Sequence, residues 1–172
     1  MDVLVTEFTR DLPAWQAFVD HLSRVNMLSS ATDQGEPKDC SFYLGAADAG
    51  AVIGHLSLRR QPLVIPASSL TRGLEMALMD DGGTAIDEVF VLSFAVEPRY
   101  RRRGFGRALQ LRALAKATEL GCFQMRSWSS ADKRENYALK ISLGFSIVPA
   151  LYPMPGGTHL SGVYFVKQTG AD

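Results

Sequence analysis

The pattern of apolar and polar positions divides the first part of the chain into a strand and a helix. Residues 3–9 alternate apolar and polar side chains and are rich in β-branched residues, which predicts a strand. Residues 12–25 predict a helix, with Asp11 before Pro13 as a plausible N-cap. The apolar positions at helical spacing in this helix are Trp15, Phe18, Val19 and Leu22.

A hairpin and a less regular segment follow. Residues 40–47 and 51–60 are strand-like and flank the sequence Asp-Ala-Gly at 48–50, a turn composition that predicts a β-hairpin. Residues 68–79 favour a helix that the Asp-Asp-Gly-Gly sequence at 80–83 would stop.

The second half of the chain begins with a strongly apolar strand and a long helix. Residues 87–96 are apolar on both faces, as in a strand at the centre of a sheet. Residues 104–120 predict a helix that is apolar on most sides and must pack against that sheet. The remaining predicted elements are a strand at 122–128, a helix at 131–143 with Asp132 and Glu135 spaced as a capping box, and strands at 145–151 and 162–168.

The element order is therefore β-α-β-β-(α)-β-α-β-α-β-β, a mixed α/β fold in one domain over residues 1–172. The balance of 18 basic and 18 acidic residues argues against general affinity for nucleic acid. Cys40 and Cys122 lie in apolar, strand-like sequence, where we expect buried, reduced thiols. We expect a cytoplasmic protein without membrane attachment, because residues 89–96, the longest uncharged apolar run, are too few to cross a bilayer and the N-terminus lacks a signal-peptide pattern.

Residues 96–109, VEPRYRRRGFGRAL, concentrate five arginines around Gly104 and Gly106. A strand that turns into a helix leaves free N–H groups at the helix start, and glycine lets an anion approach the backbone closely. The P-loop pattern is absent, and Leu109 stands where the dinucleotide fingerprint needs a third glycine. The turn therefore suits a pyrophosphate that belongs to neither a nucleoside triphosphate nor NAD, or else it is a tight turn with solvated arginines.

This stretch resembles the acetyl-CoA-binding motif of the GNAT superfamily of N-acetyltransferases. The slots of the family's V-x-P-x-[Y/F] step and [Q/R]-x-x-G-x-[G/A] turn are filled by Val96, Pro98, Tyr100, Arg101, Gly104 and Gly106. Leu-Gly-Phe at 143–145 matches a second family motif, and the elements follow the family's order. The resemblance covers almost the whole chain. It implies a single-domain mixed sheet of about seven strands with flanking helices, whose central strand splays from its neighbour at the cofactor site.

By the same resemblance, the protein uses acetyl-CoA as a co-substrate and needs no metal. The turn would hold the CoA pyrophosphate, the end of the central strand would pair with the pantetheine arm, and the Val96 N–H would polarise the thioester carbonyl. The expected cofactor contacts are Phe94, Ala95, Val96, Arg101, Arg102, Arg103, Gly104, Phe105, Gly106, Arg107, Lys133, Asn136 and Lys140.

Two positions depart from the family pattern. Lys140 stands where the family often has the tyrosine that protonates the CoA thiolate, and Lys133 stands where it often has an asparagine. Tyr137, three residues before Lys140, is the candidate substitute acid, with an ordinary packed tyrosine as the other interpretation. Lys140 could donate the proton, bind a CoA phosphate, or be a solvated cation on an exposed helix.

An incoming amine must also lose a proton, and Glu88 is the candidate base. The two-residue period of a strand places Glu88 on one face with Phe90, Leu92, Phe94 and Val96, where burial would raise its pKa. The other interpretation is that Glu88 only begins a strand at the surface.

Other polar residues carry weaker signals. Ser93 could hold a water or simply pack among its apolar neighbours, and His55 could face the acceptor or be a half-buried strand histidine. The three histidines, His21, His55 and His159, are far apart in sequence and lack zinc-ligand spacing.

The leading hypothesis is transfer of an acetyl group to a primary amine by direct attack in a ternary complex. The acceptor would be a small molecule or a peptide, nucleic acid and membranes are not expected as partners, and a homodimer is possible. A catalytically weak or inactive CoA-binding regulatory protein is the alternative, because the family's tyrosine is missing. A nucleic-acid-binding module is least supported, since the arginines are confined to one turn.

Overall fold

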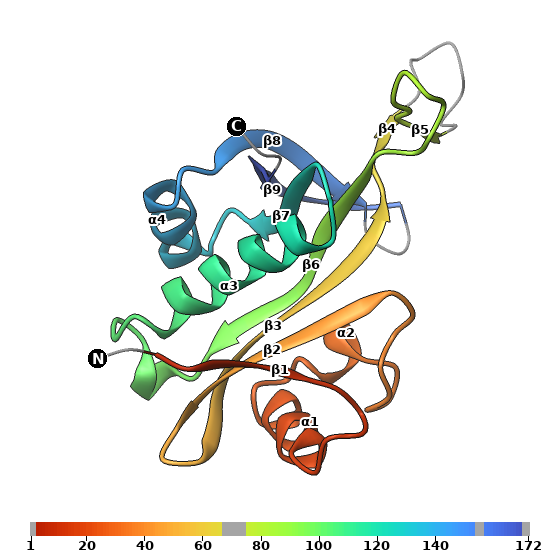
Figure 1. The fold of residues 1–172 in the computed structure, drawn as a ribbon. Helices are drawn as coiled ribbons and strands as arrows, with labels where there is room; N and C mark the ends of the chain where they lie inside the picture. Colours follow the sequence, from red (N-terminus) through yellow and green to blue (C-terminus); the bar gives the residue numbers. More distant parts are fainter. Residues whose placement is uncertain (1–2, 67–74, 154–156, 170–172) are drawn as a thin grey trace.

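The computed structural model describes residues 3–66, 75–153 and 157–169. A mixed sheet of seven strands, in the order β1-β2-β3-β6-β7-β9-β8, forms its centre, and β4 and β5 form a separate two-stranded arm (Figure 1). The strands are β1 (Val5–Phe8), β2 (Ser41–Asp48), β3 (Ala51–Pro62), β4 (Val64–Pro66), β5 (Glu75–Ala77), β6 (Asp87–Val96), β7 (Gln124–Ser130), β8 (Ser146–Pro153) and β9 (His159–Gln168). The helices are α1 (Trp15–Arg24), α2 (Leu28–Ala31), α3 (Phe105–Glu119) and α4 (Arg134–Ser142), with a 3₁₀ turn at Pro98–Tyr100.

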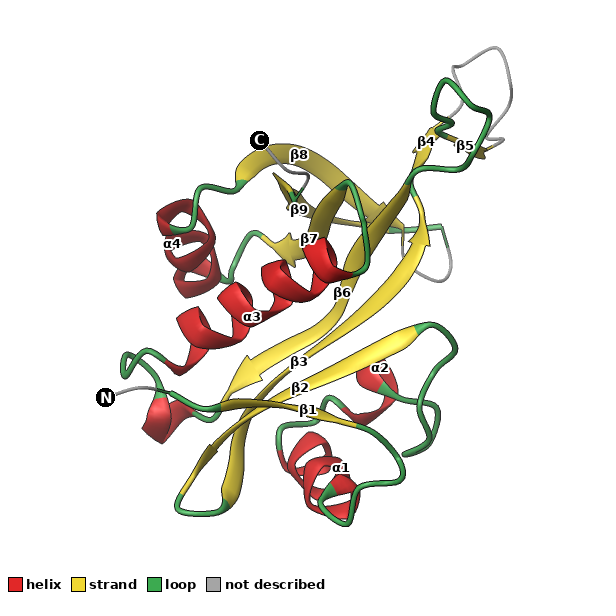
Figure 2. Cartoon of the chain, in the orientation of Figure 1, coloured by secondary structure: helices red, strands yellow, loops and turns green. Residues whose placement is uncertain are grey.

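Helices cover both faces of the sheet, α3 and α4 on one and α1 and α2 on the other (Figure 2). The larger core lies under α3, where buried residues of the helix such as Leu109 and Ala113 pack on Leu56 and Val89 of the sheet. The smaller core lies under α1 and is built around aromatic side chains, including Trp15, Phe18 and Tyr43. The predicted α/β class and the seven-stranded sheet are confirmed.

The sheet opens at its centre, as expected for the cofactor site. β6 pairs antiparallel with β3 as far as Gly54↔Val96, but its parallel pairing with β7 covers only Glu88↔Gln124 to Phe90↔Arg126. Beyond Phe90 the two strands diverge, while β7 continues to pair with β9. The predicted central strand and its splay are therefore present.

A β-bulge in β6 overturns the predicted common face of Glu88, Phe90, Leu92, Phe94 and Val96. The β3–β6 register shifts between Ser57↔Ser93 and Leu58↔Val91, so Leu92 is an extra residue. Phe94 and Val96 lie against Gly106 at the start of α3, whereas Glu88 and Phe90 alternate with Val89 and Val91 of the α3 core and face the other way. An inserted residue reverses the alternation, and no feature of the apolar run reveals it.

Three local predictions were also wrong. Residues 75–77 of the predicted helix at 68–79 form β5 and pair with β4, while residues 68–74 lie outside the described ranges. The N-cap of α1 is Ala14 rather than Asp11, because turns at Thr9–Leu12 and Leu12–Trp15 delay the helix start. No capping box forms in α4, since the Asp132 carboxylate accepts a hydrogen bond from the Ser130 hydroxyl instead.

The two cysteines differ from each other. Cys122 is buried, as predicted, but Cys40 is exposed, because it precedes β2 in a left-handed conformation with φ of 55°.

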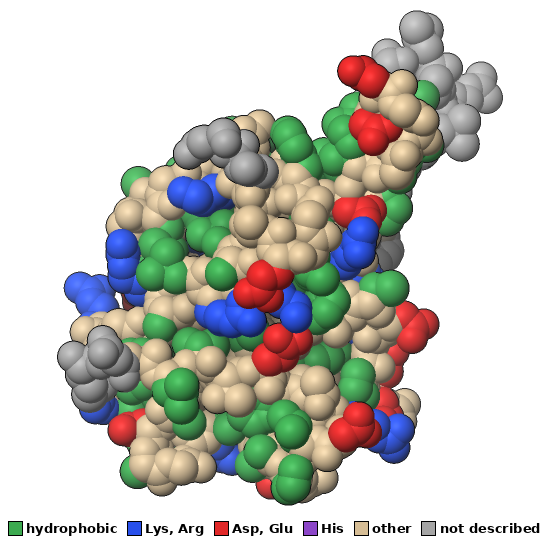
Figure 3. All heavy atoms as spheres, in the orientation of Figure 1, with side chains coloured by type: hydrophobic (Ala, Val, Ile, Leu, Met, Phe, Trp, Pro, Cys, Tyr) green, Lys and Arg blue, Asp and Glu red, His purple; other side chains and the backbone are tan. Residues whose placement is uncertain are grey.

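On the face shown in Figure 3, acidic and basic side chains are mixed over the molecule rather than gathered by sign. None of the helices among the described residues combines the length and apolar character needed to span a bilayer.

Candidate functional site

The connection from β6 to α3 is a turn of unusual backbone geometry. Arg102 adopts a left-handed φ of 61°, and Gly104, the N-cap of α3, adopts a φ of 89°. The first intrahelical bond runs from Ala108 N to Gly104 O at 3.0 Å. The N–H groups of the first helical residues therefore have no acceptor within the helix and point out of its positive end. These residues are Phe105, Gly106 and Arg107.

Different surroundings favour glycine at the two glycine positions of this turn. A Cβ built on Gly104 would meet nothing within 4 Å, so its surroundings are open and only its positive φ disfavours a side chain. A Cβ on Gly106 would lie 3.3 Å from Phe94 Cζ and 3.4 Å from Leu139 Cδ2. Gly106 thus favours the close packing of α3 on β6 and α4, since a Cβ there would push on two side chains, whereas Gly104 leaves space at the helix start.

The arginines of the turn have separate environments. Arg101 Nε donates to the Val96 carbonyl at 3.1 Å and ties the turn to the end of β6. The Arg103 guanidinium lies over the rings of Tyr100 and Phe105, at 5.4 and 5.6 Å. Within the described part of the chain, Arg102 and Arg107 have no carboxylate within ion-pair distance, in contrast to Arg99 and Arg103, which face Glu97 and Asp48. Arg102 and Arg107 therefore leave positive charge beside the free N–H groups.

The splay exposes backbone groups of β6 next to this turn. Glu97 N donates to Ile53 O at 2.9 Å, which makes these two residues a hydrogen-bonded pair of the β3–β6 ladder. In an antiparallel ladder the intervening residues point the opposite way, so the N–H groups of Phe94 and Val96 face β7. The β6–β7 ladder ends at Phe90, before it could engage them.

The splay opens the edge of β6, and an arginine-rich helix N-terminus follows at once. This arrangement agrees with a family assignment made from the sequence. The sequence model of the acetyltransferase (GNAT) family matches residues 6–139. The chain belongs to the GNAT acetyltransferase family.

Solved structures of GNAT acetyltransferases share this fold. NAA60 from Arabidopsis thaliana in complex with acetyl-CoA is 13% identical, with a TM-score of 0.67 over 97% of this chain and 98% of that one. The ribosomal-protein-S18-alanine N-acetyltransferase from Escherichia coli is 16% identical, with a TM-score of 0.61 and coverages of 98% and 96%. An aminoglycoside 6'-N-acetyltransferase complexed with coenzyme A is 14% identical, with a TM-score of 0.63 and coverages of 98% each. No curated protein matches the chain.

Lys140 is buried in this GNAT protein, so the interpretation of it as a solvated cation on an exposed helix is wrong. Only 1% of it is exposed, because this side of α4 packs against α3 and Phe145. Its Nζ donates to Gln110 Oε1 on α3 at 2.7 Å and lies 4.2 Å from the centroid of the Phe145 ring. Burial lowers the pKa of Lys140 from 10.5 to about 7. Lys140 is therefore an ammonium group that loses its proton easily.

The other predicted residues of α4 lie near its start. Lys133 is the N-cap of α4, exposed and 3.2 Å from Asp132. The partly buried Tyr137 ring packs edge-to-face on Phe165, with 5.1 Å between centroids. Asn136 has a buried Oδ1 without a hydrogen-bond partner among the described residues.

Glu88 lies at the paired end of β6, roughly 25 Å along the strand from Val96 at about 3.3 Å per residue. Its carboxylate is fully buried and accepts hydrogen bonds from Gln61 at 3.0 Å and Gln124 at 2.8 Å. Arg126 Nε lies 3.0 Å from one of its oxygens and completes a buried ion pair. These contacts give Glu88 a structural role: its carboxylate binds Arg126 across the β6–β7 ladder.

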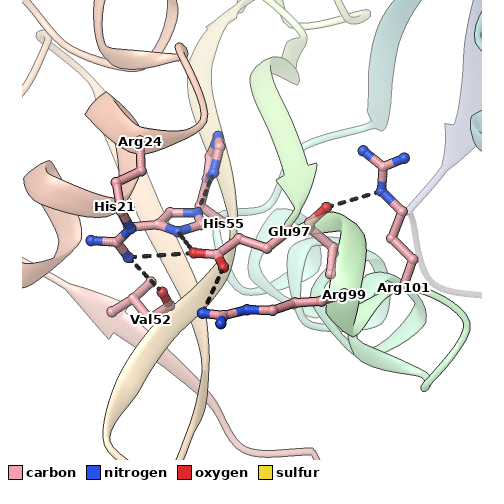
Figure 4. A network of polar contacts seen from close by, with 8 residues as sticks. His21, Arg24, Val52, His55, Glu97, Arg99 and Arg101 are labelled. Carbon is pink, nitrogen blue, oxygen red and sulfur yellow. Dashed lines mark hydrogen bonds and ion pairs between the residues drawn. The ribbon is translucent and has the colours of Figure 1, made fainter.

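Two histidines that the sequence separates by 34 residues meet beneath α1. His21 Nε2 lies 3.0 Å from His55 Nδ1, and both side chains are fully buried. His55 Nε2 lies 3.0 Å from Ser93 Oγ on β6, and His21 Nδ1 lies 3.4 Å from Glu97 Oε1. Figure 4 shows the Glu97 carboxylate between the His21 ring and the guanidinium groups of Arg24 and Arg99.

Sequence reasoning considered Ser93 and His55 one at a time and assigned no role to His21 or Glu97. A signal for His21 was available, since its helical spacing places it on the buried face of α1 with Phe18. No local feature marks Glu97, whose contact with His21 spans 76 residues. Within the described ranges, no group of three or more His, Cys, Asp or Glu side chains is arranged to hold a metal ion.

Burial keeps both imidazoles uncharged at neutral pH. It lowers the pKa of His55 from 6.5 to about 3, with the nearby His21 as a second cause. It also lowers the pKa of His21, although the hydrogen bond to Glu97 acts in the opposite direction. Burial alone would raise the pKa of Glu97, but hydrogen bonds from His21 and Arg24 outweigh it and hold that pKa below its usual value.

Proposed function

We propose that the protein is an acetyl-CoA-dependent N-acyltransferase that moves the acetyl group to a primary amine by direct attack in a ternary complex. The observation that carries this proposal is a pair of N–H groups on β6, at Phe94 and Val96, that face the gap where β7 departs and have no β7 partner among the described residues. Family membership and the acetyl-CoA complex of the similar Arabidopsis thaliana NAA60 support it.

The turn before α3 suits the pyrophosphate of CoA. Free N–H groups at the start of a helix, a left-handed glycine with open space, and arginines without carboxylate partners together favour a compact dianion. In this proposal the backbone from Arg102 to Arg107 binds the pyrophosphate, and Arg102 and Arg107 add charge. Arg101 and Arg103 act differently, since Arg101 fixes Val96 and Arg103 packs on Tyr100.

The edge of β6 suits the pantetheine arm and the thioester. Residues Phe94, Ala95 and Val96 would pair with the arm in β fashion, and the Val96 N–H would stabilise the charge that develops on the carbonyl oxygen. Ser127 Oγ on β7 and Asn136 Oδ1 on α4 are buried without partners among the described residues. A buried polar atom without a partner is costly, so amide groups of the arm would satisfy them.

Lys140 is the acid that we propose for the CoA thiolate, in place of the tyrosine of other family members. Its pKa of about 7 lies below the ordinary thiol pKa of roughly 8.5, so proton transfer from Lys140 to the thiolate is downhill. Tyr137, the acid predicted from the sequence, is the second candidate. A Tyr137→Phe variant that loses thiol release while Lys140→Met retains it would assign the role to Tyr137.

A primary amine is the acceptor class that we propose, without a choice among amines. The names of two enzymes with similar structures give different acceptors: an alanine of a ribosomal protein and the 6'-nitrogen of an aminoglycoside. Since the fold alone is shared with them, a panel of peptide and small-molecule amines is the appropriate screen.

The binding step is tested by calorimetry with acetyl-CoA on matched glycine variants. Gly104 and Gly121 lie at opposite ends of α3, have φ of 89° and 67°, and would each direct a Cβ into open space. Gly104→Gln and Gly121→Gln should therefore lose similar stability, of order 1–2 kcal/mol for a left-handed residue. Only Gly104→Gln should lose acetyl-CoA binding, and retained affinity would overturn the placement of the pyrophosphate.

The catalytic step is tested by thiol release from acetyl-CoA with the amine panel. Release with one amine class and none without an amine supports transfer. The alternative, a CoA-binding regulatory protein without turnover, predicts tight binding of acetyl-CoA and no release with any amine.

A further inference from the structure

We propose that Ser93, His55, His21 and Glu97 form a proton path that leads from the acceptor side of β6 to the surface beside α1. The inference rests on the acyltransfer proposed above and names the group that removes the proton of the acceptor amine. It also replaces Glu88 in that role, since the Glu88 carboxylate is already bound by Arg126 and two glutamine side chains.

The order of donors along this path is settled by chemistry. A carboxylate only accepts, so His21 Nδ1 carries the proton that faces Glu97. His21 is neutral, hence its Nε2 accepts from His55 Nδ1–H, and His55 Nε2 accepts in turn from the Ser93 hydroxyl. Ser57 Oγ, 2.7 Å from Ser93 Oγ, donates to Ser93 from the side and is not a member of the path. Every donor along the path therefore points toward Glu97.

The two ends of the path lie in suitable places. Ser93 is three residues before Val96 and bonds to His55 on the face of the sheet opposite α3. α3 and α4 cover one face of the sheet, and α1 and α2 lie on the face of Ser93 (Figure 2). Ser93 is 6% exposed, and in this proposal the amine approaches the thioester on the Ser93 side of the splay. At the far end, the Glu97 side chain is 13% exposed, and its partners Arg24 and Arg99 are exposed to solvent.

The charges around the path favour movement of a proton to Glu97 and disfavour a proton that stays on either histidine. Among the described residues, the charged groups that face the path are Arg24 from α1 and Arg99 beyond β6, and both lie at Glu97. The titratable group that acts on His55 is His21. Burial disfavours an imidazolium at His55 and at His21, whereas Glu97 is readily an anion. A proton that enters at Ser93 is therefore drawn on to Glu97.

The proton of the ammonium moves along the path in four exchanges. One N–H bond of the ammonium breaks, Ser93 Oγ receives that proton and passes its own to His55 Nε2. His55 passes its Nδ1 proton to His21 Nε2, and His21 passes its Nδ1 proton to Glu97, which releases it to solvent. The amine is left with its lone pair free to attack, and both rings are left neutral in the other tautomer. When the product has left, Glu97 takes up a proton from solvent, the exchanges run in reverse, and Ser93 releases one proton to water on the acceptor side, which restores the first tautomers.

Three variants test the path by the pH dependence of kcat/KM with acetyl-CoA and the best amine of the panel. Ser93→Ala removes the entry, Glu97→Gln removes the charge at the exit, and Ser57→Ala is the control that deletes a buried hydroxyl beside the path. At pH 7, Ser93→Ala and Glu97→Gln should each lose about a hundredfold or more in kcat/KM, as for other proton-transfer groups. Their acetyl-CoA affinity should match that of the wild type, and so should the profile of Ser57→Ala.

The pH profile separates the path from a merely structural role. The deficit of both variants should close as the pH approaches the pKa of the amine, because a neutral amine needs no proton acceptor before it attacks. A deficit of the same size at every pH, or an equal deficit in Ser57→Ala, overturns the path and leaves the acyltransfer intact. If Ser93→Ala does not fold, the partly exposed Glu97→Gln decides the question. Absence of thiol release by the wild type with every amine overturns the acyltransfer and the path together.

Discussion

Replacing Lys140 with methionine should make the protein more stable at neutral pH and less active. Lys140 is 1% exposed and its ammonium has one neutral hydrogen-bond acceptor, Gln110 Oε1, and the face of Phe145. Methionine has similar length and suits an apolar site. The variant thus removes the cost of burying a charge and retains most of the packing.

The magnitude follows from the pKa of Lys140, lowered from 10.5 to about 7. At about 1.4 kcal/mol per pH unit, keeping Lys140 in the folded state costs roughly 4 kcal/mol at pH 7. The variant also loses the hydrogen bond to Gln110. This loss lowers its stability by about 1–3 kcal/mol, because the buried Gln110 Oε1 is left without a donor. A net gain of about 1–3 kcal/mol remains for Lys140→Met, or roughly 2–4 °C in Tm per kcal/mol for a chain of this size.

Urea unfolding between pH 7 and 10 is the appropriate assay. The folded wild type binds fewer protons at Lys140 than the unfolded chain in this range, so its stability rises with pH. The advantage of Lys140→Met should therefore shrink by about 3 kcal/mol and vanish near pH 10. Lys116→Met, at a partly exposed lysine paired with Glu7 at 2.9 Å, is the control and should show no such trend. A Lys140→Met variant that is less stable than the wild type by the same amount at every pH would refute the reasoning.

Two further predictions concern buried ionisable groups. His55 is neutral when folded, with its pKa lowered to about 3, so stability should fall as the pH drops below 6.5, by about 2 kcal/mol at pH 5, and His55→Gln should flatten this decline in thermal melts. A wild-type Tm that is unchanged between pH 7 and 5 would contradict it. Glu88→Gln breaks the buried pair with Arg126 and should cost about 3–5 kcal/mol in urea unfolding, while kcat per folded molecule stays within a fewfold of the wild type. A hundredfold fall in kcat at unchanged stability would instead make Glu88 the base.

Local sequence determined the site that we propose for the cofactor. The apolar run at 87–96, the turn with Gly104 and the helix after it are contiguous, so their signals could be read together, and β6 and α3 lie where the pattern predicted them. The number of strands in the sheet and the splay followed from the family resemblance, which rests mainly on that contiguous stretch.

Tertiary structure alone decided the arrangement of the residues that we propose for catalysis. Lys140 is buried only because α4 packs on α3, and the extra residue at Leu92 turns Phe94 and Val96 away from the face of Glu88. His21, His55 and Glu97 come from a helix, a strand and the end of another strand, and they meet only once the sheet has formed. Such contacts depend on how distant elements pack, and burial then sets the charge of each group, which is why no local pattern in the chain could reveal them.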